Sequence, residues 1–147
     1  MNIEKIIDEI QNKIISLLRE SKKSVDTPLS ELCVDSCSEL SRLSACWLSK
    51  KLPGAQFIIV KGVGVKSGQN HDVLVVVVGQ KRHLIDATIW QFFPDHESIL
   101  LGNFDDEKEV KHFLENTYGG EWSVSEDLTE ESFKEKNEWE KVIRLNI

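Results

Sequence analysis

Cys37, His71 and Asp86 are the residues whose types could act together as a nucleophile, a base and a group that orients the base. Such a combination attacks an amide or ester carbonyl and forms a covalent thioester. It works in any chain order, because only the geometry matters. We therefore predict a catalytic triad in which Cys37 attacks, His71 moves the proton and Asp86 orients His71. Water or an acceptor amine then resolves the thioester.

Cys37 is predicted to open a helix. Ser36, followed three residues later by Glu39, has the pattern of a capping box, and apolar residues continue the helix to about residue 51. With Ser36 as N-cap, free backbone N–H groups and the positive end of the helix dipole lie beside the sulfur. These surroundings favour the thiolate, which is the nucleophilic form of cysteine.

His71 and Asp86 are predicted on neighbouring strands, 71–78 and 82–92, joined by a hairpin around 79–81. A loop centred on Val78-Gly79 places the two residues directly opposite each other. A loop centred on Gln80-Lys81 separates them by roughly 13 Å, which is too far for a hydrogen bond. Both registers are compatible with the sequence. A carboxylate within so apolar a strand requires a partner, and His71 is the candidate, with Asp86 holding its tautomer.

The other histidines have structural interpretations. His83 is a rival base, but a regular strand points it to the face opposite Asp86. His96 and His112 lie in acidic polar stretches and are expected at the surface.

The other cysteines are predicted to be structural. Cys33 and Cys46 are expected to be small buried apolar groups. A zinc site formed by Cys33, Cys37 and His71 is a second interpretation of the same residues. It lacks the second close pair of ligands that zinc sites usually have.

The elements around these residues predict an α+β fold, with helices packed on a mainly antiparallel sheet. We expect an amphipathic helix at 3–20, a strand at 56–65 with a bulge near Gly62 and Gly64, and a C-terminal helical region at 105–145. That region is divided into helices at 105–118 and 128–145. The run 73–78 is apolar throughout, which is typical of a central strand covered on both faces.

Length and charge limit the possible functions. The 147 residues suggest a single domain over 1–147, with a catalytic core at about 30–93. A formal net charge of −7 argues against nucleic acid and against an anionic membrane surface as partners. With no signal-peptide pattern, no membrane-spanning run and three cysteines, the sequence predicts a reducing, cytoplasmic location. An effector delivered into another cell's cytoplasm would have the same features.

The segments that carry the three residues resemble the papain-like and transglutaminase-like cysteine superfamily. The matching runs are Asp35-Ser36-Cys37-Ser38-Glu39-Leu40, Asn70-His71-Asp72-Val73-Leu74-Val75 and Leu84-Ile85-Asp86-Ala87-Thr88. Small bacterial papain-fold toxins and glutamine-deamidating effectors are similar in size. Their Asp-x-Thr-x-x-Gln-Phe-like run resembles residues 86–92. The resemblance implies a papain-like fold, a thioester at Cys37, a protein substrate attacked at a glutamine side chain or a peptide bond, and no cofactor.

One position departs from the papain pattern. Papain-like peptidases place an oxyanion-stabilising glutamine shortly before the cysteine, where this chain has Glu31, which cannot donate a hydrogen bond when ionised. The Cys37 N–H is one replacement donor, and Asn70 or Gln91 is a second. Deamidase, transglutaminase-like acyltransferase and specialised thiol protease all remain open. The alternative is a catalytically silent interaction module that binds through its acidic helices.

Overall fold

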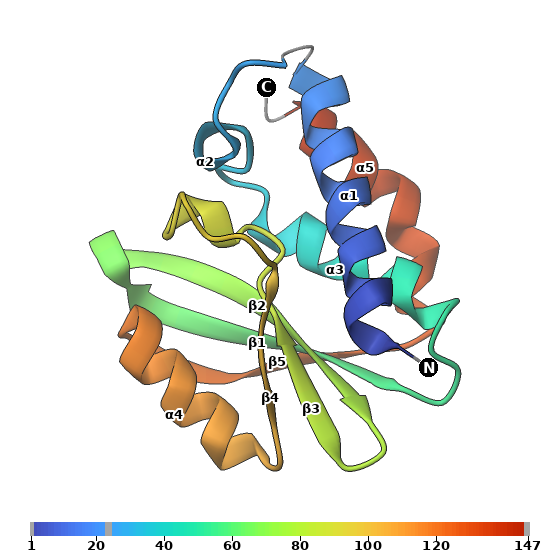
Figure 1. Cartoon of the computed structure of the whole chain (residues 1–147), viewed down its shortest axis with the longest axis vertical. Coiled ribbons are helices and arrows are strands. Elements are labelled where there is room, and N and C mark those ends of the chain that lie inside the picture. The colour runs from blue at the N-terminus through green and yellow to red at the C-terminus, as the bar shows by residue number, and fades with distance from the viewer. Residues whose placement is uncertain (1, 23–24, 146–147) are drawn as a thin grey trace.

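The computed structural model describes residues 2–22 and 25–145 and is built around one five-stranded sheet (Figure 1). The spatial order of the strands is β4-β3-β2-β1-β5, and every neighbouring pair is antiparallel. The predicted α+β class with an antiparallel sheet is confirmed. The strands are β1 (Gln56–Val65), β2 (Gln69–Val78), β3 (Lys81–Ile85), β4 (Leu100–Phe104) and β5 (Glu121–Leu128).

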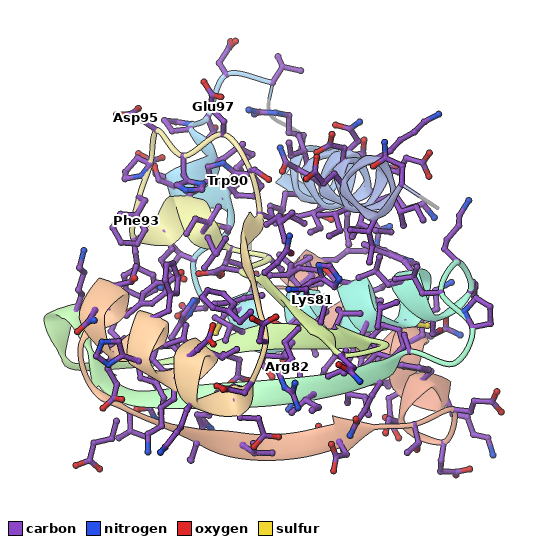
Figure 2. The ribbon with its side chains drawn as sticks, turned by 60° about the horizontal axis from the view of Figure 1, so that its bottom comes forward. Lys81, Arg82, Trp90, Phe93, Asp95 and Glu97 are labelled. Atoms are coloured by element: carbon purple, nitrogen blue, oxygen red, sulfur yellow. The ribbon has the colours of Figure 1, made fainter. Side chains whose placement is uncertain are left out.

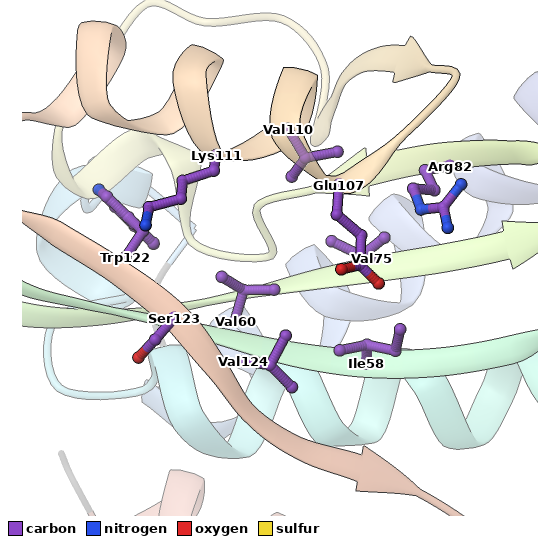
Figure 3. A pocket seen from close by; sticks show the side chains of 10 residues that line it. All are labelled: Ile58, Val60, Val75, Arg82, Glu107, Val110, Lys111, Trp122, Ser123 and Val124. Carbon is purple, nitrogen blue, oxygen red and sulfur yellow. The ribbon is translucent and has the colours of Figure 1, made fainter.

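Helices cover both faces of this sheet. On one side α1 (Ile3–Lys22), α3 (Cys37–Ser49) and α5 (Lys136–Leu145) pack together, and α3 lies on β2. On the other side lies α4 (Glu107–Tyr118), as Figure 3 shows, with the strands between it and α3. The short helix α2 (Leu29–Leu32) packs against the 3₁₀ turn η2 (Ile89–Gln91). Two further 3₁₀ turns are η1 (Lys66–Gly68) and η3 (Ser132–Glu135).

The N-terminal half follows its sequence pattern closely. The apolar stripe of α1 is buried at Ile7, Ile10, Ile14 and Leu18, as its helical spacing predicts. β2 is the central strand, and Val73 to Val76 are buried, which confirms the interpretation of that apolar run. The expected bulge is present between Gly62 and Val65.

The β2–β3 hairpin adopts neither of the two registers considered from the sequence. Val78 pairs with Lys81, so the turn consists of Gly79 and Gln80, and Gly79 takes the left-handed φ of +61° that such a turn requires. Leu74 pairs with Ile85. Continuing this register places Asp86 two residues from the position opposite His71, on the same face, within reach of a long side chain.

The strand predicted at 82–92 is too long, because β3 ends at Ile85. Both the backbone N–H and the hydroxyl of Thr88 donate to Asp86 Oδ1, at 3.0 and 3.4 Å. This local turn competes with strand pairing, as Asp side chains often do, and bends the chain into η2.

The C-terminal region at 105–145 is helical only in part: the first predicted helix is confirmed, whereas the second is predicted too long. The helix expected at 105–118 begins at Glu107, with Asp106 as its N-cap accepting from the Glu109 N–H at 2.9 Å. The helix expected at 128–145 begins only at Lys136. β4 and β5 were not predicted. Both are edge strands, and β5 is mostly exposed, so neither carries a clear apolar alternation.

Among the described residues, no helix combines the length and the apolar character needed to cross a membrane.

Candidate active site

A buried His71–Asp86 pair forms the centre of the candidate site. His71 Nε2 and Asp86 Oδ2 are 2.8 Å apart, and the two residues are 1% and 0% exposed. His71 lies near the start of β2, and Asp86 is the first residue after β3. The predicted pairing of these two side chains is therefore present. A histidine held in this way by a carboxylate has one ring nitrogen committed and the other left for chemistry.

Asp86 is fully hydrogen-bonded despite its burial. Thr88 satisfies Oδ1, whereas Oδ2 accepts from both His71 Nε2 and the Tyr118 hydroxyl. The backbone N–H of Asp86 also donates to the Ile99 carbonyl at 2.8 Å. These donors offset the cost of removing a carboxylate from water, and they fix its orientation toward His71.

Tyr118 is a member of the site that the sequence reasoning missed. It is the last residue of α4 and 1% exposed, and burial beside the Asp86 charge raises the pKa of its hydroxyl well above the usual range. The hydroxyl therefore stays protonated and donates. Val110, Leu114 and Tyr118 are spaced by four along α4, a signal that Tyr118 faces the interior. Nothing in the sequence places it on Asp86.

Aromatic rings enclose the imidazole. The Phe92, Tyr118 and Trp122 ring centroids lie 4.7, 5.4 and 6.3 Å from that of His71. Gly62 pairs with His71 on one side and with Trp122 on the other, and a Cβ at Gly62 would lie 2.6 Å from the Trp122 ring. The absence of a side chain at Gly62 is what lets the indole lie across the sheet toward His71.

Cys37 is half-buried at the start of α3, where its sequence predicts it. Ser36 occupies the N-cap position, but the predicted capping box is wrong: its hydroxyl donates to the Val34 carbonyl at 3.5 Å and caps no N–H. Asp35 turns the chain into the helix with a left-handed φ of +62°. The first-turn N–H groups beside Cys37 therefore do not donate to the Ser36 side chain.

The thiol of Cys37 interacts electrostatically with the His71 ring. Burial by itself lowers the pKa of His71, but the charge and hydrogen bond of Asp86 raise it, and the Cys37 thiol adds to this, giving about 10. His71 Nδ1 is buried and completes no hydrogen bond with any residue in the described ranges. Catalytic hydrogen bonds are often long until substrate binds, so this geometry fits a nitrogen that faces a nucleophile.

Arg42 ties the helix of Cys37 to the strand of His71. Its Nη1 donates to the Ser38 hydroxyl at 2.7 Å and lies 3.2 Å from Asp72 Oδ2, while its Nη2 lies 3.0 Å from Glu126. Ser38 follows Cys37 and Asp72 follows His71. One guanidinium therefore sets the position of both site residues through their chain neighbours.

Cys33 and Cys46 are buried, as expected. The Cys33 thiol donates weakly to the Thr88 carbonyl at 3.9 Å, and burial, together with the nearby Asp86 charge, raises its pKa to about 12. It is therefore protonated and unreactive at neutral pH.

The two side chains suggested for the oxyanion are not free donors directed at His71. Asn70 is exposed, and as the strand neighbour of His71 it points to the other face of β2. Gln91 is half-buried and donates to Gln69 Oε1 at 3.1 Å. The Cys37 N–H remains the best-placed candidate.

The other histidines lie apart from the pair. His83 Nδ1 is 2.5 Å from Asn103 Oδ1 on β4, on the face that a regular strand predicts, and His96 and His112 are exposed. Figure 2 shows Trp90 and Phe93 on the segment after β3, where the Trp90 Nε1–H donates to the His96 carbonyl at 3.0 Å.

Within residues 2–22 and 25–145, no cluster of three His, Cys, Asp or Glu side chains is placed to hold a metal ion. Comparison of the chain with protein-family models, with curated proteins and with solved structures finds no match.

Proposed function

We propose that this chain is a thiol-dependent enzyme that acts on an amide or ester carbonyl through a thioester at Cys37. The observation that carries the proposal is the buried His71–Asp86 hydrogen bond, with the Cys37 thiol close enough to the same ring to raise the pKa of His71. A buried ion pair by itself contributes little to the free energy of unfolding. Residues with strongly shifted pKa values, in contrast, are concentrated at functional sites. Tyr118 and Thr88 hold the carboxylate in place for this role.

The raised pKa of His71 indicates an imidazolium at neutral pH beside the Asp86 carboxylate. In the proposed mechanism Cys37 reacts as the thiolate. In the proposed reaction, the Cys37 sulfur attacks the carbonyl carbon and the carbonyl π electrons move to the oxygen. Collapse of this intermediate breaks the bond to the leaving group, which takes the Nδ1 proton of His71.

The neutral imidazole then accepts a proton from water as that water attacks the thioester. Expulsion of the thiolate regenerates the starting ion pair. The N–H groups at the start of α3 supply positive potential where the oxyanion develops.

At a finer level we propose a papain-like enzyme of the bacterial effector or toxin type, either a protein glutamine deamidase or a specialised protease. The order of Cys, His and Asp along the chain supports this, as does the placement of Cys37 at a helix start. The exposed surface of a small acidic chain suits a protein substrate with a basic surface.

The experiment compares alkylation of the three cysteines by iodoacetamide across pH 5–9, with peptide mass spectrometry to separate the sites. Cys37 should react fastest and remain reactive at acidic pH, because the His71 imidazolium stabilises the thiolate. The variant His71→Gln should lower the rate of Cys37 alkylation by at least about tenfold, the size expected for the loss of one ion-pair partner. His83→Gln, another buried histidine on the sheet, is the matched control and should leave the rate unchanged.

Equal rates for Cys37 in the wild type and in His71→Gln would contradict the proposal and favour the silent interaction module. Incubation with candidate proteins, followed by intact-mass analysis, then separates deamidation, cleavage and acyl transfer. Cys37→Ala is the inactive control.

A further inference from the structure

A cavity of about 250 Å³ lies between α4 and the sheet (Figure 3). Its apolar lining comes from Ile58, Val60, Val75, Val110, Trp122 and Val124. None of Cys37, His71 and Asp86 lines it. Trp122 is the shared wall, because its ring also faces His71.

Charged side chains stand at the mouth of this cavity. Arg82 and Lys111 carry two positive charges and Glu107 one negative charge, so the mouth is net positive on a chain of net charge −7. Figure 3 shows Arg82 and Lys111 toward opposite ends, with Glu107 between them.

Arg82 supplies a guanidinium at this mouth. Its Nη1 donates to the Asp105 carbonyl at 3.1 Å, and the residue is half-buried in the lining of the cavity. A guanidinium carries five N–H donors, so one bond to a carbonyl leaves others for a ligand. The cavity therefore combines an apolar body with a cationic hydrogen-bond donor.

We propose that this cavity binds a small amphipathic carboxylic acid, with its hydrocarbon part against the valines and its carboxylate on Arg82. The apolar lining favours a hydrocarbon body. The net positive mouth favours an anionic head over a cationic one, and a carboxylate oxygen accepts charge-assisted hydrogen bonds from a guanidinium such as that of Arg82. The site is separate from Cys37 and does not depend on the proposed reaction.

The test titrates hexanoate, hexylammonium and 1-hexanol into the full chain carrying ¹³C-labelled valine methyl groups. Hexanoate should shift the methyl signals of Val60, Val75, Val110 and Val124 saturably, while the distant, exposed Val34 stays unmoved. Hexanol should bind about tenfold more weakly, the loss expected for one charge-assisted hydrogen bond, and hexylammonium more weakly still.

Three variants locate the head group and the tail. Arg82→Gln should weaken hexanoate about tenfold without changing hexanol. Glu107→Gln, at an exposed position, should strengthen hexanoate and further weaken hexylammonium. Val124→Trp, at a half-exposed position of β5, should block all three compounds by filling the cavity.

The proposal fails if saturating hexanoate leaves the four methyl signals unmoved, or if the three head groups bind equally well. It also fails if Arg82→Gln and Glu107→Gln do not move the hexanoate affinity in opposite directions. These two substitutions keep the test decisive even if Val124→Trp does not fold.

Discussion

At the scale of single residues, the site depends on how a buried carboxylate is hydrogen-bonded. Asp86 is 0% exposed, and its two oxygens accept from a backbone N–H, two hydroxyls and an imidazole. A hydrogen bond to a charged acceptor is worth about 1.5–3 kcal/mol, so removal of any one donor should be measurable.

Tyr118→Phe removes one donor from Asp86 Oδ2 while keeping the aromatic ring. We expect a loss of about 1.5–3 kcal/mol in the free energy of unfolding, measured by urea denaturation, because the carboxylate loses a charge-assisted bond. Cys37 alkylation should slow by less than in His71→Gln. Thr88→Val is the matched control: it removes only the 3.4 Å hydroxyl contact to Oδ1 and should cost less. Equal losses in the two variants would contradict this ranking.

His71 makes stability depend on pH in a defined direction. Its pKa is raised from 6.5 to about 10 in the folded chain by Asp86 and Cys37, in spite of burial. The contribution of His71 to the free energy of unfolding is therefore complete below pH 6.5 and declines as the pH rises toward 10. In this range the folded chain still binds a proton that the unfolded chain has lost, so rising pH favours the unfolded chain. Denaturation of wild type and His71→Gln across this window should show a smaller decline in the variant. The exposed His112→Gln should follow the wild type.

At the scale of elements, a row of three residues across β2, β1 and β5 sets the shape of the site. His71, Gly62 and Trp122 are register partners, and the middle position has no side chain. The sequence marks Gly62 as a bulge position, and the bulge is present. The sequence does not predict β5, which carries Trp122. The contact of Gly62 with the Trp122 indole was therefore not predictable.

Gly62→Ala should displace the Trp122 ring, because the new Cβ would lie 2.6 Å from it. Overpacking of this kind costs about 1–3 kcal/mol, which urea denaturation can detect. Gly102→Ala is the matched control: its Cβ would lie 3.3 Å from the Phe104 ring, a contact that a shift of a few tenths of an ångström relieves, so it should cost less. If the two variants have equal free energies of unfolding, the close approach of Trp122 to Gly62 does not affect stability.

The local patterns predict α1, α3, β1 and β2 well because burial there imposes strong periodicity on the residues. They overextend β3, because the turn at Asp86 depends on Thr88 and on burial, not on a glycine or proline. Cys37, His71 and Asp86 were identifiable by type and order. Tyr118 was not, because it reaches Asp86 only through the packing of α4 on the sheet, which no local pattern encodes.

At the scale of the whole molecule, Cys37 belongs to the helical layer and His71 to the sheet, so their distance depends on how the layers pack. Arg42 is a charged link between these layers near the site, through Ser38, Asp72 and Glu126, and the Ser41 hydroxyl adds a bond to the Asp72 carbonyl at 3.4 Å. Asp72 is buried, so the pairing also prevents an uncompensated charge.

Arg42→Met should therefore slow Cys37 alkylation and lower the thermal midpoint, because α3 loses its link to β2 and Asp72 is left unpaired. Lys51→Met removes an exposed pair with Glu9 at 3.8 Å, and an exposed pair contributes little. Lys51→Met should leave both the Cys37 alkylation rate and the thermal midpoint near the wild-type values. A normal alkylation rate in Arg42→Met would show that the Arg42 ion pairs do not set the spacing of the layers.

The enclosure of His71 has a consequence for the order of events in the proposed reaction. Rings close around the imidazole, Nε2 is committed to Asp86, and the ring is almost inaccessible. Whatever collects a proton from Nδ1 must approach from the side of Cys37, and so must the water that follows. The first product has to depart before the second reactant can enter. Turnover should then show double-displacement kinetics, with an initial burst of leaving group whenever hydrolysis of the thioester is the slower half.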